Sequence, residues 1–261
     1  MSDSVLIDVV GVTVRVRVDG AERLRTILAN VMVDEPADAA VGPVDADADD
    51  VEGVLAAAVR AAIDSSPDLL LHAGAVAADG QVTVFPGASG QGKSTLTAAC
   101  LRHGFGYVTD ELVAVDLDTQ QVNGLARPLF LTAWSVRAMG LPDDDAADDL
   151  VGKPAGKRAV PPEQLGSATT PGRHPVANVV IARRGAQASA LTPIAAGTVF
   201  EEILTASFNH YVHAERAWTA AVALANSARG WRLDVADPAS AAELVAGLTS
   251  SAGAGAGGSP G

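Results

Sequence analysis

The segment that most constrains the fold lies at residues 87–94, where the sequence GASGQGKS fits the pattern G-x-x-x-x-G-K-[ST]. The residues before it, 82–85, are β-branched and aromatic, which is typical of a strand. Residues 93–102 have helical spacing, and Gly104 follows at the position expected of a C-cap. A strand, a glycine-rich loop and a helix in this order predict an α/β core.

This motif predicts a phosphate-binding loop. Glycines let backbone N–H groups turn toward phosphate oxygens, and the following helix adds its positive N-terminal end. Lys93 would reach the β- and γ-phosphates, and the Ser94 hydroxyl could bind Mg²⁺. The alternative is a glycine-rich turn that fits the pattern by chance. We expect a nucleotide site made of Gly87, Ala88, Ser89, Gly90, Gln91, Gly92, Lys93, Ser94 and Thr95.

Two further positions carry candidate chemistry. Asp110 and Glu111 lie between short apolar strands, at the end of a strand that we expect beside the phosphate-loop strand. Carboxylates there could hold Mg²⁺ or take the proton from an attacking hydroxyl or water. An exposed acidic turn is the alternative. His72 lies within the expected strand 69–76, where by itself a histidine is more often structural than functional.

These segments together resemble a known family. His72-Ala73-Gly74, the phosphate loop, and RHGFGYVTDELVAVD at residues 102–116 are similar to the catalytic domain of HPr kinase/phosphorylase, and more closely to short HPr-kinase-like proteins of peptide-modification clusters such as those of lasso peptides. The similarity covers residues 69–118 well and the rest weakly. It implies a phosphoenolpyruvate-carboxykinase-like P-loop core, ATP and Mg²⁺ as cofactors, and His72 near the acidic pair.

The resemblance also implies a mechanism, with two departures. In the family, an aspartate of the acidic pair takes the proton from a substrate serine. This chain has Glu111 where the bifunctional enzymes have a second aspartate. Either Asp110 or Glu111 could therefore be the base. The family's Glu-Ile-Arg-Gly motif is replaced by ARPLFLTAWS, and residues 120–142 contain no acid. We therefore expect a kinase without phosphorylase activity. The family's regulatory N-terminal domain also looks absent.

Further cations are needed around a transferring phosphoryl group. Lys153, Lys157 and Arg158 could form a lid over the triphosphate, although a solvated loop is equally consistent with them. Arg127 is a weaker candidate. We assign the three tryptophans to the core. The three tryptophans are Trp134, Trp218 and Trp231. His210 and His213 have a spacing that could suit a metal, but no third ligand is apparent.

The remaining elements are read from periodicity and turn residues. Residues 5–18 predict a β-hairpin, 51–63 a helix, and 176–182 and 231–235 strands. Helices are expected at about 198–209 and 215–228, and after Asp237-Pro238. Residues 34–52 and 142–175 are expected to be long surface loops. The expected division is an N-terminal hairpin, acidic loop and helix (1–68), a catalytic core (69–248) and a disordered tail (249–261).

Charge and composition exclude other classes. The net charge of −13 disfavours nucleic acid and anionic membranes as partners. Residues 34–52 and 143–149 hold eight and five acids without a base, so the acidity is expected in two loops outside the core. A single cysteine, Cys100, and the absence of a leader-like start suggest a cytoplasmic protein.

We expect an ATP- and Mg²⁺-dependent kinase acting on a hydroxyl, most readily a serine of a peptide or small protein. An ATP-binding switch or scaffold without phosphotransfer and a small-metabolite kinase are the alternatives. The sequence does not specify the oligomeric state, and a homo-oligomer is possible.

Overall fold

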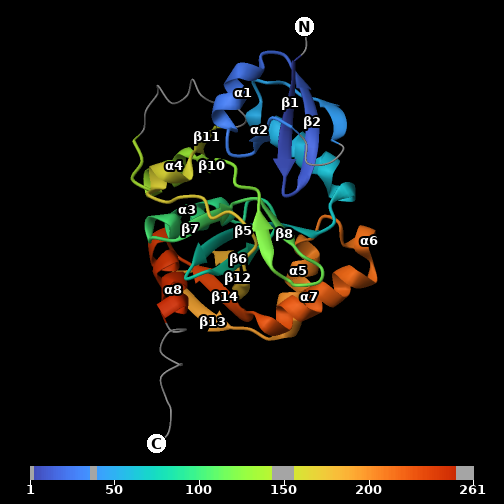
Figure 1. Ribbon diagram of the computed structural model, residues 1–261. Coiled ribbons are helices and arrows are strands. Elements are labelled where there is room, and N and C mark those ends of the chain that lie inside the picture. The colour runs from blue at the N-terminus through green and yellow to red at the C-terminus, as the bar shows by residue number, and fades with distance from the viewer. Residues whose placement is uncertain (1–2, 36–39, 143–155, 251–261) are drawn as a thin grey trace, which may run out of the picture.

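The centre of the molecule is an eight-stranded mixed sheet (Figure 1). The computed structural model describes residues 3–35, 40–142 and 156–250. The strands follow the order β13-β14-β12-β6-β5-β8-β9, and β7 also pairs with β5. Their bounds are β5 Leu69–Ala78, β6 Gln81–Pro86, β7 Gly106–Thr109, β8 Leu112–Val115, β9 Val122–Gly124, β12 Val176–Arg184, β13 Ala190–Pro193 and β14 Arg229–Val235.

Helices cover both faces of this sheet (Figure 1). On one face α3 (Lys93–Arg102) and α8 (Pro238–Ser250) bury side chains against β5, β6, β12 and β14. On the other face α5 (Ala196–Ala206) and α7 (Glu215–Ser227) do the same. Strands β6, β12 and β14 are parallel, and β5 is antiparallel to β6. Because β5 is covered on both faces, it is apolar almost throughout instead of alternating. The predicted α/β class is confirmed.

Gly74 brings helix α3 close to β5. A Cβ atom at this position would lie 2.6 Å from Oγ1 of Thr97 and 3.8 Å from Cβ of Lys93. Real Cβ contacts are not that short, so a side chain here would push the helix or Thr97 away. The glycine of the His72-Ala73-Gly74 segment therefore sets the distance between the sheet and the helix that begins at Lys93.

The N-terminal residues form a separate four-stranded sheet in the order β3-β1-β2-β4, seen above the central sheet in Figure 1. The elements are β1 Asp3–Val9, β2 Val12–Val18, α1 Ala21–Ile27, β3 Met32–Val33, β4 Val41–Asp45, α2 Val51–Ala62 and the 3₁₀ turn η1 Ile63–Ser65. The predicted hairpin and helix are confirmed. Their buried valines and leucines pack on Leu70, Leu112, Leu125 and Phe130 of the core.

The prediction of two long loops is wrong in part. Residues 34–52 contain β4, which runs parallel to β2, and the start of α2, capped by Asp50. Residues 142–175 contain β11 (Lys157–Val160), which pairs with β10 (Leu129–Thr132), and the 3₁₀ turn η3 (Pro162–Leu165). Such short strands are fixed by pairing with distant partners, so they leave little periodicity to read. Lys153 and the acidic run 143–149 lie outside the described residues, as does the tail from 251 onward.

The position of the acidic pair in the sheet is also corrected. The strand that ends before Asp110 is β7, and β5 lies between it and the phosphate-loop strand β6. Helix α3 has the predicted bounds, and α8 begins at Pro238 with Asp237 accepting a hydrogen bond from the Ser240 N–H. The helices α4 (Ala133–Ala138) and α6 (His210–His213) complete the fold.

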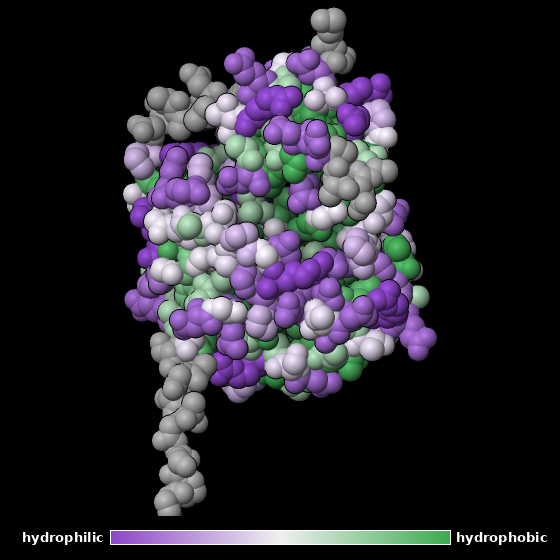
Figure 2. Space-filling model, in the orientation of Figure 1, coloured by the Kyte–Doolittle hydropathy of each residue, from purple (hydrophilic) through white to green (hydrophobic). Residues whose placement is uncertain are grey.

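The surface is mostly hydrophilic on the face seen in Figure 2, with apolar side chains visible in small areas. Among the described helices, none has the length and apolar character needed to cross a membrane.

Candidate active site

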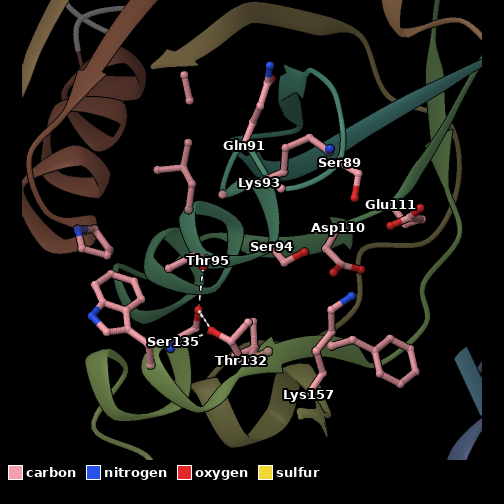
Figure 3. Close-up of a pocket in the computed structure, with 18 of the residues that line it drawn as sticks. Ser89, Gln91, Lys93, Ser94, Thr95, Asp110, Glu111, Thr132, Ser135 and Lys157 are labelled. Carbon is pink, nitrogen blue, oxygen red and sulfur yellow. Dashed lines mark hydrogen bonds between the residues drawn. The ribbon is translucent and has the colours of Figure 1, made fainter. Parts of the chain in front are cut away.

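A cavity of about 380 Å³ lies over the phosphate loop (Figure 3). Its walls come from the loop and the start of α3, from the β7–β8 turn, from β10 and α4, and from the ends of β12 and β14. Helix α2 of the N-terminal unit adds Glu52. The predicted loop residues 89–95 line this cavity, together with His72, Asp110 and Glu111. The structure thus brings together residues that the sequence analysis had selected and that are far apart in the chain, from His72 to Lys157.

The phosphate loop turns sharply between β6 and α3. Gly90 and Gly92 have left-handed φ values of 81° and 92°, which glycine adopts without strain. Lys93 is buried, and its Nζ donates to the carbonyl oxygens of Gly87 (2.8 Å) and Ala88 (2.9 Å). Gly87 and Ala88 therefore contribute backbone oxygens behind the cavity. The first N–H groups of α3 have no intrahelical partner, so they are available to an anion.

Asp110 is fully buried and is held by two neighbours. Arg127 Nε lies 3.2 Å from its Oδ1, and Arg127 Nη2 lies 3.5 Å from its Oδ2. The Tyr107 hydroxyl donates to the carbonyl oxygen of Arg127 (2.8 Å) and lies 3.2 Å from Oδ1 of Asp110. Burial, followed by the negative charge of Asp110, raises the pKa of Tyr107, which keeps this phenol protonated. Asp110 thus has both oxygens engaged by fixed donors.

Glu111 has a different environment. Its side chain is 37% exposed, and its Oε2 accepts a hydrogen bond of 3.0 Å from Arg127 Nη2. Its Oε1 lies 3.4 Å from Nε2 of His72. Burial raises the pKa of Glu111, while the Arg127 charge opposes this shift. Both carboxylates line the cavity, but Asp110 is fully buried among fixed donors, whereas Glu111 is partly exposed to it.

His72 is uncharged at neutral pH in this site. Burial, followed by the charges of Lys93 and Arg127, lowers the pKa of His72 to about 4, and the charge of Asp110 opposes this shift. Its ring stacks on Phe208 with centroids 5.6 Å apart. The contact with Glu111 therefore joins a neutral imidazole to a carboxyl group, and the ring is positioned by an aromatic neighbour.

The two basic candidates that the structure describes in the predicted lid, Lys157 and Arg158, lie on opposite sides of strand β11. Lys157 lines the cavity and forms a 2.7 Å ion pair with Glu52. Arg158, next along β11, instead donates to the Pro142 carbonyl oxygen and to Gln164, so it does not line the cavity. Alternation along a strand explains this split. Arg127, the weaker candidate, is the buried cation at the centre of the site, and its guanidinium lies 4.7 Å from the Phe130 ring centroid.

The assignment of all three tryptophans to the core is wrong for two of them. Trp134 is 53% exposed and Trp218 is 52% exposed, whereas Trp231 is half-buried and donates to Asn178. Trp134 lies on α4 and lines the cavity. Sequence alone could not separate these cases, because each tryptophan follows or precedes apolar residues.

The histidine pair does not form a metal site. His213 Nε2 lies 3.0 Å from the carbonyl oxygen of Asp68 and 3.3 Å from Asn209 Nδ2. Within residues 3–35, 40–142 and 156–250, no cluster of three or more His, Cys, Asp or Glu side chains is arranged to hold a metal ion. This bears on dedicated protein cages, whereas Mg²⁺ in phosphate sites commonly takes one or two carboxylates together with phosphate oxygens and water.

The donors in the cavity fit magnesium. Ser94 offers a hydroxyl at the start of α3, and Asp110 and Glu111 offer carboxylates in the same cavity (Figure 3). These are hard oxygen donors of the kind that Mg²⁺ prefers.

Among the contributors to this cavity that the sequence analysis missed are Arg184, Ser135 and Glu52. Arg184, at the end of β12, donates to the Gly90 carbonyl oxygen at 3.3 Å and packs against Gly92. Ser135 links the first turn of α3 to α4, because its hydroxyl lies 2.8 Å from that of Thr95. Glu52 comes from the N-terminal unit. None belongs to a motif, so only the fold identifies them.

Comparison with known proteins adds no family assignment. The chain matches none of the protein-family models with which it was compared. It likewise matches none of the curated protein sequences.

Proposed function

We propose that this protein is an ATP- and Mg²⁺-dependent kinase that phosphorylates a hydroxyl, most readily a serine of a peptide or small protein. The observation that carries the proposal is one cavity that joins Lys93 and the phosphate loop to the Asp110–Glu111–Arg127 cluster. The mixed α/β sheet, with the loop between β6 and α3, supports a P-loop core of the HPr-kinase-like type.

In this proposal the triphosphate lies along residues 89–95. Lys93 exchanges its contacts with the Gly87 and Ala88 carbonyl oxygens for β- and γ-phosphate oxygens. Ser94 and the Asp110 carboxylate would hold Mg²⁺, which when bound would neutralise charge on the β- and γ-phosphates. Lys157 and Arg184 border the same cavity and add positive charge to its rim.

Glu111 is the proton acceptor in this mechanism. It is reachable from the cavity and burial raises its pKa, whereas both oxygens of Asp110 are bonded to Arg127 or Tyr107. A base works best when its pKa approaches the working pH. The acceptor oxygen forms a bond to the γ-phosphorus as the bond from that phosphorus to the β,γ-bridging oxygen breaks. The hydroxyl proton passes to Glu111, and ADP leaves with the electron pair.

Asp110 and Arg127 act as positioning groups. Arg127 holds both carboxylates, since its Nη2 lies 3.0 Å from Glu111 Oε2 and its Nε lies 3.2 Å from Asp110 Oδ1. Neutral His72 lies beside the other oxygen of Glu111. Arg127 and His72 would thus keep both oxygens of Glu111 oriented, and the low pKa of His72 keeps its imidazole from taking the proton that Glu111 accepts.

The test is phosphoryl transfer followed by mass spectrometry. The protein is incubated with ATP, Mg²⁺ and a panel of serine-containing peptides and an HPr-like protein, with threonine and alanine versions as matched controls. A mass increase of one phosphoryl group on the serine version is expected, and none on the alanine version. If phosphate is transferred to a small metabolite and to none of the peptides, the protein is a small-metabolite kinase instead. ATP-dependent partner binding without transfer to any acceptor would favour the switch.

A further inference from the structure

The cavity has a second end that the phosphotransfer chemistry does not use. In Figure 3, Asp110 and Glu111 lie on one side of Ser94, and Thr95 and Ser135 lie on the other. The second side is that of α4, which carries Trp134 next to Ser135, and the cavity lining also includes the apolar residues Leu96, Val235 and Pro238. We propose that this apolar end binds the aromatic base of the nucleotide, with the Trp134 indole as its stacking surface. This inference rests on the proposed nucleotide site.

Trp134 differs from the other exposed tryptophan in its position. Its side chain is 53% exposed, much as that of Trp218 is 52% exposed, but of these two only Trp134 lines the cavity. Single exposed apolar residues are common on protein surfaces, so it is the position beside the phosphate loop, and not the exposure, that indicates a ligand covering the indole. A flat aromatic ligand would do so, because an indole stacks on nucleobases through its π-face.

The position of Trp134 is fixed relative to the phosphate loop. The Thr132 hydroxyl caps α4 by accepting from the Ser135 N–H at 3.2 Å. The Ser135 hydroxyl lies 3.0 Å from that of Thr132 and 2.8 Å from that of Thr95 (Figure 3). Thr95 belongs to the first turn of α3, next to Ser94. One chain of three hydroxyls therefore ties the helix that carries Trp134 to the helix that would bind the phosphates.

Two further residues of the cavity lining suit the same ligand. Pro238, at the first position of α8, and Val235, at the end of β14, are half-buried and carry no charge. A base in contact with these residues and with Trp134 would extend away from the phosphates that Lys93 holds. The γ-phosphate would then point toward Glu111, in the direction that transfer requires.

The test compares a nucleotide with an inorganic ligand that has no base. Binding of ADP and of tripolyphosphate, each with Mg²⁺, is measured by calorimetry for the wild type, Trp134→Ala and Trp134→Phe. Trp218→Ala is the matched control, because Trp218 is 52% exposed on α7 and does not line the cavity. A second readout is tryptophan fluorescence during the ADP titration.

The expected result is a loss of ADP affinity of about tenfold or more in Trp134→Ala, a smaller loss in Trp134→Phe, and unchanged tripolyphosphate affinity in both. ADP should quench the fluorescence of the wild type and of Trp218→Ala but not of Trp134→Phe. Unchanged ADP affinity in Trp134→Ala would overturn the inference, as would an equal loss for tripolyphosphate. A wild type that binds neither ligand would instead refute the nucleotide site itself.

Discussion

The two ends of the cavity are built in opposite ways. At the charged end, Asp110 and Arg127 are almost fully buried and bonded to each other, and Tyr107 closes the network from behind. At the apolar end, Trp134 is open to solvent, and its helix is tied to α3 through the hydroxyls of Ser135 and Thr95. Chemistry needs groups fixed before the substrate arrives, because reorganising them during reaction costs rate. Stacking on a base tolerates an open surface, because the ligand itself covers it.

Lys93 lies between the two ends, so its substitution should have the largest effect. Lys93→Ala removes the cation that we assign to the β- and γ-phosphates, and it should lower turnover by about 10³-fold or more. It should also weaken both ADP and tripolyphosphate, since both contact it through phosphate. Calorimetry and a turnover assay check this, with Arg102→Ala, on the last turn of the same helix, as control. Equal turnover in Lys93→Ala and wild type would remove the loop from the mechanism.

The acidic pair should separate into two kinds of effect. Glu111→Gln removes the base and should lower turnover by about 10²- to 10⁴-fold while ADP affinity and stability change little. Asp110→Asn removes one of the negative charges that balance the buried positive charge of Arg127. It should therefore lower the free energy of unfolding by roughly 3 kcal/mol. Turnover and urea unfolding measure the two effects. A Glu111→Gln variant with wild-type turnover would refute Glu111 as the proton acceptor, whether or not Asp110→Asn folds.

His72 should make stability depend on pH. Its pKa is about 4 in the folded chain, below its ordinary value, so the unfolded chain binds a proton between about pH 6.5 and 4 that the folded chain does not. The free energy of unfolding is therefore highest above about pH 6.5, where His72 is neutral in both states. It falls by roughly 3 kcal/mol as the pH drops to 4.

The raised pKa of Glu111 acts in the opposite sense, because the folded chain then holds the extra proton. The measurement therefore compares Glu111→Gln with Glu111→Gln/His72→Asn by urea unfolding from pH 4 to 7. A shallower slope is expected in the double variant. Identical slopes would mean that His72 titrates normally.

Gly74 tests the close packing beneath both ends. Gly74→Ala would bring a Cβ to 2.6 Å from Thr97 Oγ1 and should destabilise the protein by about 1 to 3 kcal/mol. Thr97 Oγ1 is buried and has no hydrogen-bond partner among the described residues, so Thr97→Ala alone should cost little. Thermal or urea unfolding should show that Thr97→Ala rescues Gly74→Ala. Additive losses would place the strain elsewhere.

The smallest effect is expected at the rim. Lys157 and Glu52 form a partly exposed ion pair, so breaking it should change stability by less than about 1 kcal/mol. Lys157→Ala should lower the ADP affinity, because it removes a positive charge from the cavity wall. Glu52→Gln should raise the ADP affinity, because it removes a negative one. A change in the same direction for both would mean that Lys157 does not face the phosphates.

The sequence predicted the charged end well and the apolar end not at all. Local patterns were sufficient for the loop, for helix α3 and for the selection of Asp110 and Glu111, whereas His72 was selected only through the family resemblance. Arg127 was underrated, because its importance comes from burial beside two carboxylates brought together by the fold. Trp134 was assigned to the core, because hydrophobicity does not distinguish a buried indole from one that lines a cavity. Strands β4 and β11 were missed since their stability comes from distant pairing partners.

The most direct measurement of the central claim follows label from [γ-³²P]ATP into a serine-containing peptide with the wild type, Glu111→Gln and Trp134→Ala. The account predicts labelled serine with the wild type, ADP binding but almost no label with Glu111→Gln, and label that recovers at high ATP concentration with Trp134→Ala. Transfer that is unchanged in Glu111→Gln, or ATP binding with no transfer by the wild type to any hydroxyl acceptor, would contradict it.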